Sequence, residues 1–195
     1  MDFNLSKAFD YENGFYLTSS VQRIGKFASH LELFRRSSGL AGDIVECGVF
    51  KGASLSRFLK FRALFETPAN RKIHGFDTFG AFPPADDPMD EKKREEFVSQ
   101  AGSTSIPRQQ LLDLFNGLGL NENLDLVEGD IRETIPAFCD DNPELGISLL
   151  NIDVDLLEPT RICLEHFYPR VVSGGIVILD DYGTFPGATK AADDY

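Results

Sequence analysis

Acidic side chains follow most of the short apolar runs in this 195-residue chain. Five such runs, each the length of one buried strand, occur at residues 44–49, 72–76, 125–127, 147–152 and 176–179. The acids within or just after them are Glu46, Asp77, Glu128, Asp130, Asp153, Asp155, Asp180 and Asp181. Open parallel sheets bind ligands beyond the carboxyl ends of their strands. The repetition therefore favours a shared acidic site more strongly than any one of these residues does.

Asp153, Asp180 and Asp181 predict a site for a metal ion. If the strands at 147–152 and 176–179 are neighbours, these acids end side by side, about 5 Å apart. Two like charges about 4 Å apart repel by roughly 4 kcal/mol at an effective dielectric constant of about 20, so three of them need a cation. Carboxylates without clustered histidine or cysteine favour a hard divalent ion, Mg²⁺ first, with Mn²⁺ or Ca²⁺ as alternatives. A solvated acidic rim or a set of helix caps is the other interpretation.

The first half of the chain carries features of a nucleoside site. Asp77, at the end of the second run, can accept two hydrogen bonds from a ribose diol, as NAD and other ribosyl ligands require. The turn Glu46-Cys-Gly-Val-Phe-Lys-Gly52 lacks the GxGxxG spacing that a pyrophosphate needs. The chain has no GxxxxGK[ST] phosphate loop either. A ribosyl ligand without a pyrophosphate fits this pattern better than NAD does.

Glu46 lies inside a predicted buried strand, where an ionised carboxylate is costly unless it is paired. A ligand ammonium would pair it, and S-adenosylmethionine carries an ammonium together with a ribose and a sulfonium. A nearby lysine, arginine or backbone amide would satisfy Glu46 equally well. S-adenosylmethionine is therefore a candidate ligand, and the structural alternative stays open.

The order of the elements predicts a fold that brings these strand ends together. Apolar residues from Val21 to Phe34 recur every three or four positions, which predicts an amphipathic helix. Further helices are predicted over about 55–65, through 111–118 and after Pro159. Strands that alternate with helices predict a parallel sheet in an α/β fold. Residues 79–108 lack strand character and predict a solvated loop with a surface helix, or a substrate lid.

Composition restricts the classes of function. Hydrophobic residues make up 42% of the chain, which predicts one domain over residues 1–195, with an N-terminal helical region at 1–40. Nineteen Lys and Arg against 31 Asp and Glu give a net charge of −12, which speaks against nucleic-acid and membrane-surface partners.

The cysteines and the N-terminal segment indicate the compartment. Cys47, Cys139 and Cys163 form no CxxC pair, so neither a disulfide framework nor a thiolate zinc site is predicted. The chain begins with acidic and polar residues, unlike a signal peptide, and no run approaches the roughly 18 apolar residues of a membrane helix. A cytoplasmic protein is expected.

Four ordered stretches, spread over residues 42–195, match one known family. They are Gly42–Gly52 (GDIVECGVFKG), Gly75–Phe79 (GFDTF), Asn151–Thr160 (NIDVDLLEPT) and Gly174–Gly183 (GGIVILDDYG), followed by Pro186-Gly and Lys190–Tyr195. The chain resembles the macrocin O-methyltransferase family, magnesium-dependent S-adenosylmethionine enzymes that methylate sugar hydroxyls. The resemblance implies a Rossmann-like class I methyltransferase fold, a three-layer sandwich with a mainly parallel sheet.

The resemblance also implies roles for the first group of acids. Glu46, Gly48 and Ser54 match residues that hold the methionine part of S-adenosylmethionine. Asp77 matches the residue that holds its ribose, and Asp130 is expected beside its adenine.

The second group of acids matches the metal site of the family. Asp153, Asp180 and Asp181 correspond to its metal-binding acids, and Asp153 is also the expected general base. Asp155 is expected to support this site without binding the metal. The implied reaction is in-line transfer of a methyl group from the sulfonium to a hydroxyl of a sugar or another small molecule, with the metal lowering the pKa of that hydroxyl.

The sequence departs from the family in two places. Ala53 stands where the family commonly has a second glycine. Family members also continue beyond Lys190–Tyr195 with two further strands, so we expect a missing C-terminal part and an edge strand at 176–179.

Other interpretations stay open. The same acids would serve a metal-dependent hydrolase or a phosphoryl-transfer enzyme, and a shortened relative would serve as a non-catalytic binding module. A homodimer is a further option, although the helix with Phe27 and Phe34 is expected to cover its own sheet.

Overall fold

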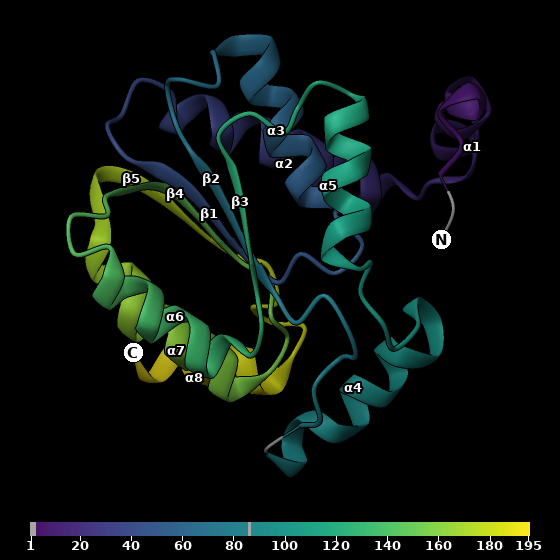
Figure 1. The fold of residues 1–195 in the computed structure, drawn as a ribbon. Coiled ribbons are helices and arrows are strands. Elements are labelled where there is room, and N and C mark those ends of the chain that lie inside the picture. Colours follow the sequence, from purple (N-terminus) through teal and green to yellow (C-terminus); the bar gives the residue numbers. More distant parts are fainter. Residues whose placement is uncertain (1–2, 86) are drawn as a thin grey trace.

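Five parallel strands form the centre of the structure, a computed structural model that describes residues 3–85 and 87–195 (Figure 1). The strands are β1 (Asp43–Cys47), β2 (Ile73–Asp77), β3 (Leu124–Glu128), β4 (Ile147–Ile152) and β5 (Val171–Leu179). Their order in the sheet is β3-β2-β1-β4-β5, and every neighbouring pair is parallel. The predicted parallel sheet is confirmed, and so is the pairing of the last two strands.

Helices cover both faces of the sheet and complete three layers (Figure 1). One face carries α2 (Val21–Ser37), α3 (Ala53–Phe65) and α5 (Arg108–Gly117), and the other carries α6 (Ile131–Asp141), α7 (Leu157–Phe167) and α8 (Pro186–Asp194). Successive strand residues point to opposite faces. Ile44 therefore belongs to the buried cluster of the first face with Phe58, whereas Val45 belongs to that of the second face with Phe167. The predicted three-layer sandwich is confirmed.

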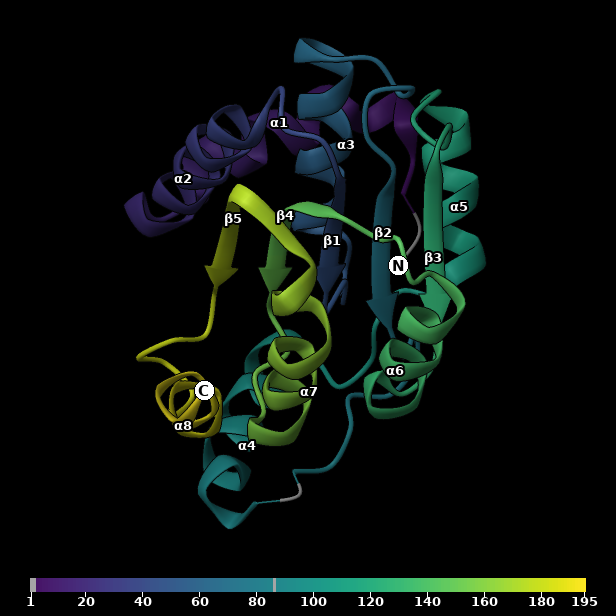
Figure 2. The same cartoon turned by 90° about the vertical axis from the view of Figure 1, so that its left-hand side faces the viewer.

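The remaining elements lie outside these layers. A short 3-10 turn (Leu5–Lys7) and α1 (Ala8–Thr18) contain no buried residue, and α1 stands apart from the sheet (Figure 1). Helix α4 (Pro88–Ala101) lies beyond the carboxyl ends of the strands (Figure 2). A second 3-10 turn (Tyr168–Arg170) leads into β5. In the part of the chain that is described, no helix has the length and hydropathy that a bilayer crossing requires.

The largest shift in the predicted element bounds is in β5. This strand begins at Val171, which pairs with Ile147, and after a register shift the pairing with β4 resumes at Ile176, where the predicted run begins. Helix α3 begins at Ala53, directly after the turn glycine Gly52. Helix α2 packs against α3 of the same chain, and Phe27 and Phe34 join the core there, as expected.

Gly48 allows the ends of β1 and β4 to approach each other closely. Its φ is +89°, and a Cβ built there would lie 1.7 Å from the carbonyl oxygen of Asp153. The Asp153 amide donates a hydrogen bond of 2.9 Å to the carbonyl of Cys47, the residue before the glycine. Any side chain at Gly48 would separate the two strand ends, so this glycine fixes the position of Asp153.

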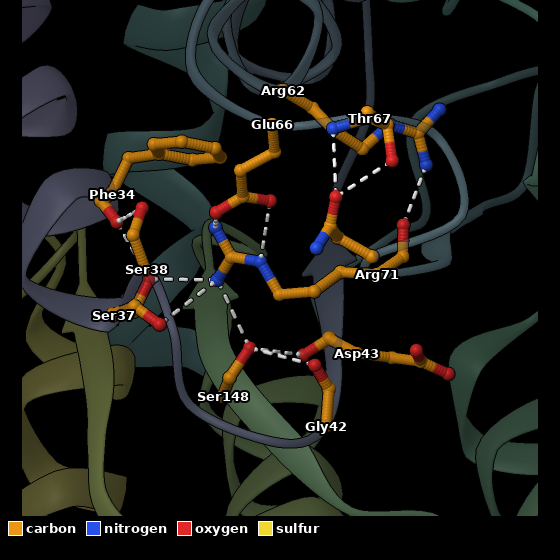
Figure 3. Close-up of polar contacts among 11 residues, drawn as sticks. Phe34, Ser37, Ser38, Gly42, Asp43, Arg62, Glu66, Thr67, Arg71 and Ser148 are labelled. Carbon is orange, nitrogen blue, oxygen red and sulfur yellow. Dashed lines mark hydrogen bonds and ion pairs between the residues drawn. The ribbon is translucent and has the colours of Figure 1, made fainter.

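The opposite ends of the strands are held together by the buried side chain of Arg71 (Figure 3). Its guanidinium donates to both carboxylate oxygens of Glu66, at 2.7 and 3.0 Å. It also donates to the hydroxyls of Ser37 and Ser148, at 2.9 and 3.1 Å. Because these partners come from α2, the end of α3 and β4, the network ties both helices to the sheet at the end away from the acidic residues.

Replacing Gly48 with alanine should destabilise the protein by at least about 3 kcal/mol, because the new Cβ would collide with the backbone at a φ that side chains rarely adopt. Gly25→Ala is the matched control. Gly25 lies in the middle of α2, and a Cβ built there meets nothing within 4 Å. This control should be stabilised by about 0.5–1 kcal/mol. Urea unfolding followed by circular dichroism measures both, and a wild-type midpoint for Gly48→Ala would contradict the close contact.

Candidate active site

The carboxyl ends of all five strands open onto one cavity of about 480 Å³. Figure 2 shows the strand arrows pointing together toward this side of the molecule, where α4 lies. Helix α2 and the segment around α4 contribute walls to the cavity. The predicted site residues that line it are Gly48, Ser54, Asp77, Asp130, Asp153, Asp180 and Asp181. The structure thus brings residues from both predicted halves of the site into one cavity, whereas the fully buried Glu46 is not among its lining residues.

Three carboxylates converge after β4 and β5. Asp153, Asp155 and Asp181 each place an oxygen so that all three atoms lie within 4.8 Å of one another. The backbone amide of Asp155 donates to Asp181 Oδ2 at 2.9 Å, which fixes one loop against the other. Asp155 reaches this position through a left-handed backbone, with φ +64°. These three residues are called the acid triad below.

The three carboxylates of the acid triad are buried and repel one another, so they ionise with difficulty unless a positive charge lies nearby. Burial, with the charges of Asp181 and Asp180, raises the pKa of Asp153 to about 8. Burial and the charge of Asp153 raise the pKa of Asp155 to about 7, and burial raises the pKa of Asp181 well above its ordinary value. A bound cation would stabilise the ionised carboxylates and so offset these shifts. The oxygen donors and the missing charge therefore fit a hard divalent ion.

The acid triad differs from the predicted metal-binding set at one position. Asp153 and Asp181 come together as predicted, but the third oxygen belongs to Asp155, which was expected only to support the site. Asp180 turns instead toward helix α2, where Lys26 Nζ lies 2.5 Å from its Oδ2. The same ammonium lies 3.3 Å from Asp153 Oδ2. Asp180 and Asp153 are thus joined through Lys26.

Lys26 and His30 are site residues that the sequence did not reveal. They lie one turn apart on α2, and His30 Nε2 is 4.0 Å from Asp180 Oδ1. Burial alone would lower the pKa of Lys26, but Asp153 and Asp180 outweigh it and raise the pKa. Burial, together with Arg57 and Lys26, lowers the pKa of His30 to about 4, so its ring is neutral. The only signal in the sequence was a pair of polar residues, four apart, beside the apolar stripe of this helix.

Glu46 is fully buried and is bound by neutral donors. The Ser54 hydroxyl donates to its Oε1, and the amide of Asn151 lies 3.5 Å from the same oxygen. Its Oε2 has no hydrogen-bond partner among the described residues. Burial raises the pKa of Glu46 to about 8. The lysine or arginine partner that the sequence left open does not contact Glu46, and the free oxygen suits a ligand ammonium.

Asp77 connects the ends of β1 and β2. Its Oδ2 accepts from the amide of Phe50 at 2.8 Å, and its Oδ1 accepts from the amide of Phe79 at 2.7 Å. Oδ2 can accept a second hydrogen bond, whereas Oδ1 also accepts a long one, of 3.4 Å, from the Thr78 hydroxyl. The residue also lines the cavity, so ribose hydroxyls could bind Oδ2 and take the place of the Thr78 contact at Oδ1.

Asp130 forms the N-terminal cap of α6 by accepting from the amide of Arg132 at 2.9 Å. The Arg132 guanidinium also donates to this carboxylate, at 2.5 to 3.0 Å, and this hydrogen bonding lowers its pKa. Asp130 therefore has a structural role, while it also lines the cavity on the β3 side, where the adenine is expected.

Helix α4 lies in the segment predicted as a loop with a surface helix or a lid, and Asp90 is one of the residues that join it to the rest of the structure. This buried carboxylate accepts from the amide of Leu157, at the start of α7, at 2.9 Å. It also accepts from the amide of Gly187, at the start of α8, at 2.8 Å. Phe82 and Phe97 of the same segment line the cavity. The contacts of Asp90 could not be predicted, because its partners are distant in the chain.

Sequence comparison relates this architecture to known enzymes. The family model described as macrocin O-methyltransferase (TylF) matches residues 16–195. The chain is 29% identical over 161 residues to the 8-demethyl-8-(2,3-dimethoxy-alpha-L-rhamnosyl)-tetracenomycin-C 4'-O-methyltransferase of Streptomyces olivaceus, covering 82% of this chain and 59% of that protein. It is 25% identical over 190 residues to the mycinamicin III 3''-O-methyltransferase of Micromonospora griseorubida, covering 95% of this chain and 72% of that protein. The chain thus spans about 59% of the length of the first of these relatives.

Solved structures have the same fold. CalS11, a calicheamicin methyltransferase, superposes with a TM-score of 0.75 at 28% identity, covering 100% of this chain and 78% of that one. The O-methyltransferase NovP has a TM-score of 0.71 at 23% identity, covering 87% of this chain and 70% of that one, and supports the fold alone. The predicted Rossmann-like methyltransferase fold is confirmed. Because the family match extends over residues 16–195, the chain belongs to the macrocin O-methyltransferase (TylF) family.

Proposed function

We propose that this protein is an S-adenosylmethionine-dependent O-methyltransferase that needs a divalent metal and acts on a hydroxyl of a sugar-bearing small molecule. The observation that carries the proposal is the acid triad, three oxygens within 4.8 Å, inside the cavity that Asp77 and Ser54 also line. A methyl donor and a hydroxyl acceptor must meet in one enclosed space, and this cavity supplies residues suited to each. The names of the relatives, which are O-methyltransferases of glycosides, support the same reaction class.

The β1 and β2 side of the cavity suits S-adenosylmethionine. Glu46 has an unpartnered buried oxygen for the ammonium of the methionine part. Asp77 can accept from the ribose hydroxyls, and Asp130 lies farther along, on the adenine side. Gly48 lets the end of β1 lie against the backbone of Asp153, so a sulfonium bound beside this turn would lie close to Asp153.

The β4 and β5 side suits a divalent ion, and Mg²⁺ is the first choice because all the donors are carboxylate oxygens. Asp153, Asp155 and Asp181 would hold it, and Asp180, which matches a family ligand, lies next to them. When bound, the ion would lower the pKa of an acceptor hydroxyl.

Asp153 is the proposed general base. It lines the cavity, and it would accept the hydroxyl proton as the carbon–sulfur bond breaks and the carbon–oxygen bond forms. The leaving sulfide is neutral and needs no acid. Orientation of the two reactants can contribute roughly 7–11 kcal/mol, so most of the rate should come from how the cavity walls position donor and acceptor.

The acceptor side of the cavity combines apolar rings with acidic groups. Phe82, Phe97 and Phe185 line it, and the acid triad forms its polar end. Such a surface suits a deoxysugar, which has one apolar face and a few hydroxyls. The solved relative described as a TDP-rhamnose 3'-O-methyltransferase and the rhamnosyl substrate named for the Streptomyces olivaceus enzyme fit this chemistry.

Glu46→Gln should weaken the binding of S-adenosylhomocysteine by at least about tenfold, because it removes a buried charge that faces the ammonium. 5'-Methylthioadenosine, which lacks the amino-acid part, is the matched probe and should bind both proteins alike. Isothermal titration calorimetry measures each affinity. An equal loss of affinity for both ligands, or no loss for either, would contradict the role of Glu46.

The same role predicts a pH dependence. In the free protein the pKa of Glu46 is raised to about 8, so below that pH the ammonium must displace a proton from the carboxylate. The affinity for S-adenosylhomocysteine should therefore rise with pH, by up to about tenfold per unit, and level off near pH 8 in the wild type. The profile of Glu46→Gln should lack this rise.

Asp153→Asn should lower turnover of a rhamnoside acceptor by at least about 100-fold, since the amide cannot accept the hydroxyl proton. It should also weaken Mn²⁺ binding and leave S-adenosylhomocysteine affinity unchanged. Asp113→Asn, on the exposed side of α5, is the control. Release of S-adenosylhomocysteine and Mn²⁺ titration give the two measurements. If Asp153→Asn alters neither turnover nor Mn²⁺ binding, the metal and base assignments are wrong. A wild-type protein that does not bind the cofactor at all would point to the hydrolase alternative.

A further inference from the structure

Lys26 gives the acidic residues their one directly contacting cation among the described side chains. Its Nζ lies 2.5 Å from Asp180 Oδ2 and 3.3 Å from Asp153 Oδ2. The lysine comes from α2, more than a hundred residues earlier in the chain than the two acids. No part of the proposed methyl transfer requires this contact, so it needs an explanation of its own.

One ammonium cannot neutralise this group of acids. Four carboxylates lie at the ends of β4 and β5, and Lys26 contacts only Asp153 and Asp180. Asp155 and Asp181 contact each other instead. Asp153 is shared, because it belongs both to the acid triad and to the Lys26 pair. A divalent ion that binds the triad therefore competes with Lys26 for the same carboxylate.

The side chain of Lys26 is able to leave. Its side chain is 34% exposed, its four-carbon stem is flexible, and within the described part of the chain its ammonium contacts only the two carboxylates. His30, one turn along α2, lies 4.0 Å from the other oxygen of Asp180, and neither ring nitrogen has a hydrogen-bond partner among the described residues. This neutral ring can steady Asp180 but cannot replace the charge. Arg23 and Arg57 also line the cavity without an ion pair to these acids.

We propose that Lys26 is an internal counterion that a divalent cation displaces: the ammonium holds Asp153 and Asp180 in the metal-free protein and withdraws when the metal binds. Displacement frees Asp180 to join the acid triad. It also removes the ion pair between the strand ends and α2, a helix that lines the cavity with Gln22 and Arg23. Lys26 is thus a positioning residue that sets metal affinity and links it to this helix. The inference rests on the divalent site of the proposed function.

The test is the affinity for Mn²⁺, measured by electron paramagnetic resonance of the free ion. Lys26→Met should bind Mn²⁺ about tenfold more tightly than the wild type, because no ammonium has to be displaced. Lys26→Arg keeps a cation at the site and should stay within about threefold of the wild type. Lys72→Met is the matched control, since it also breaks a lysine–aspartate pair of 3.3 Å, with Asp125 at the other end of the sheet. The control should bind Mn²⁺ as the wild type does.

A gain in affinity distinguishes this role from a structural one, because damage to the fold would weaken binding. Unchanged or weaker Mn²⁺ binding by a folded Lys26→Met protein would overturn the proposal. An equal gain of Mn²⁺ affinity in Lys72→Met would also overturn it, because the gain would then come from the change in net charge of the protein.

A measurement on the wild type covers the case in which Lys26→Met does not fold. The side-chain ¹³Cε resonance of Lys26, assigned by its absence from Lys26→Arg, should move to the position of a free lysine as Mg²⁺ is added. The shift should saturate together with Mg²⁺ occupancy. A resonance that stays constant while Mg²⁺ binds would overturn the proposal and leave the proposed function standing. If neither wild type nor Lys26→Met binds a divalent ion, the metal part of the proposed function fails as well.

Discussion

Repulsion among carboxylates is the interaction on which the arrangement of this cavity depends. Asp153, Asp155 and Asp181 come from loops after two neighbouring strands and hold oxygens within 4.8 Å of one another. Their raised pKa values follow from burial and from this crowding. Such a cluster persists only where protons, a lysine or a metal ion reduce its charge. The proposed metal site, the proposed base and the contact of Lys26 with the acids all rest on that one electrostatic need.

The two ends of the sheet have different roles in the structure. At one end Arg71 binds α2, the end of α3 and β4 through a buried ion pair and serine hydroxyls, which holds the helices against the strands (Figure 3). At the other end the half-exposed Lys26 joins α2 to Asp153 and Asp180, and Gly48 brings the ends of β1 and β4 close together. The Arg71 network thus holds the helices to the sheet at the end opposite the cavity.

The sheet and part of the candidate site could be predicted from the sequence, but features that depend on loop geometry or on distant contacts could not. The parallel sheet follows from alternating strands and helices, and the meeting of Asp153 with Asp181 follows from the pairing of β4 and β5. Whether Asp155 or Asp180 joins the acid triad does not follow from the sequence. It depends on the left-handed backbone of Asp155 in one loop and on the directions of the Asp180 and Asp181 side chains in the other. Lys26 could not be predicted, since its partners lie in a distant part of the chain and long-range pairing leaves no local pattern.

The central claim is that the convergent carboxylates form a cation site, and anomalous diffraction tests it most directly. Crystals grown with Mn²⁺ and S-adenosylhomocysteine would be measured at the manganese edge. The account predicts an anomalous peak among the side-chain oxygens of Asp153, Asp155 and Asp181. An ordered cavity with bound S-adenosylhomocysteine and no peak at these residues would contradict it.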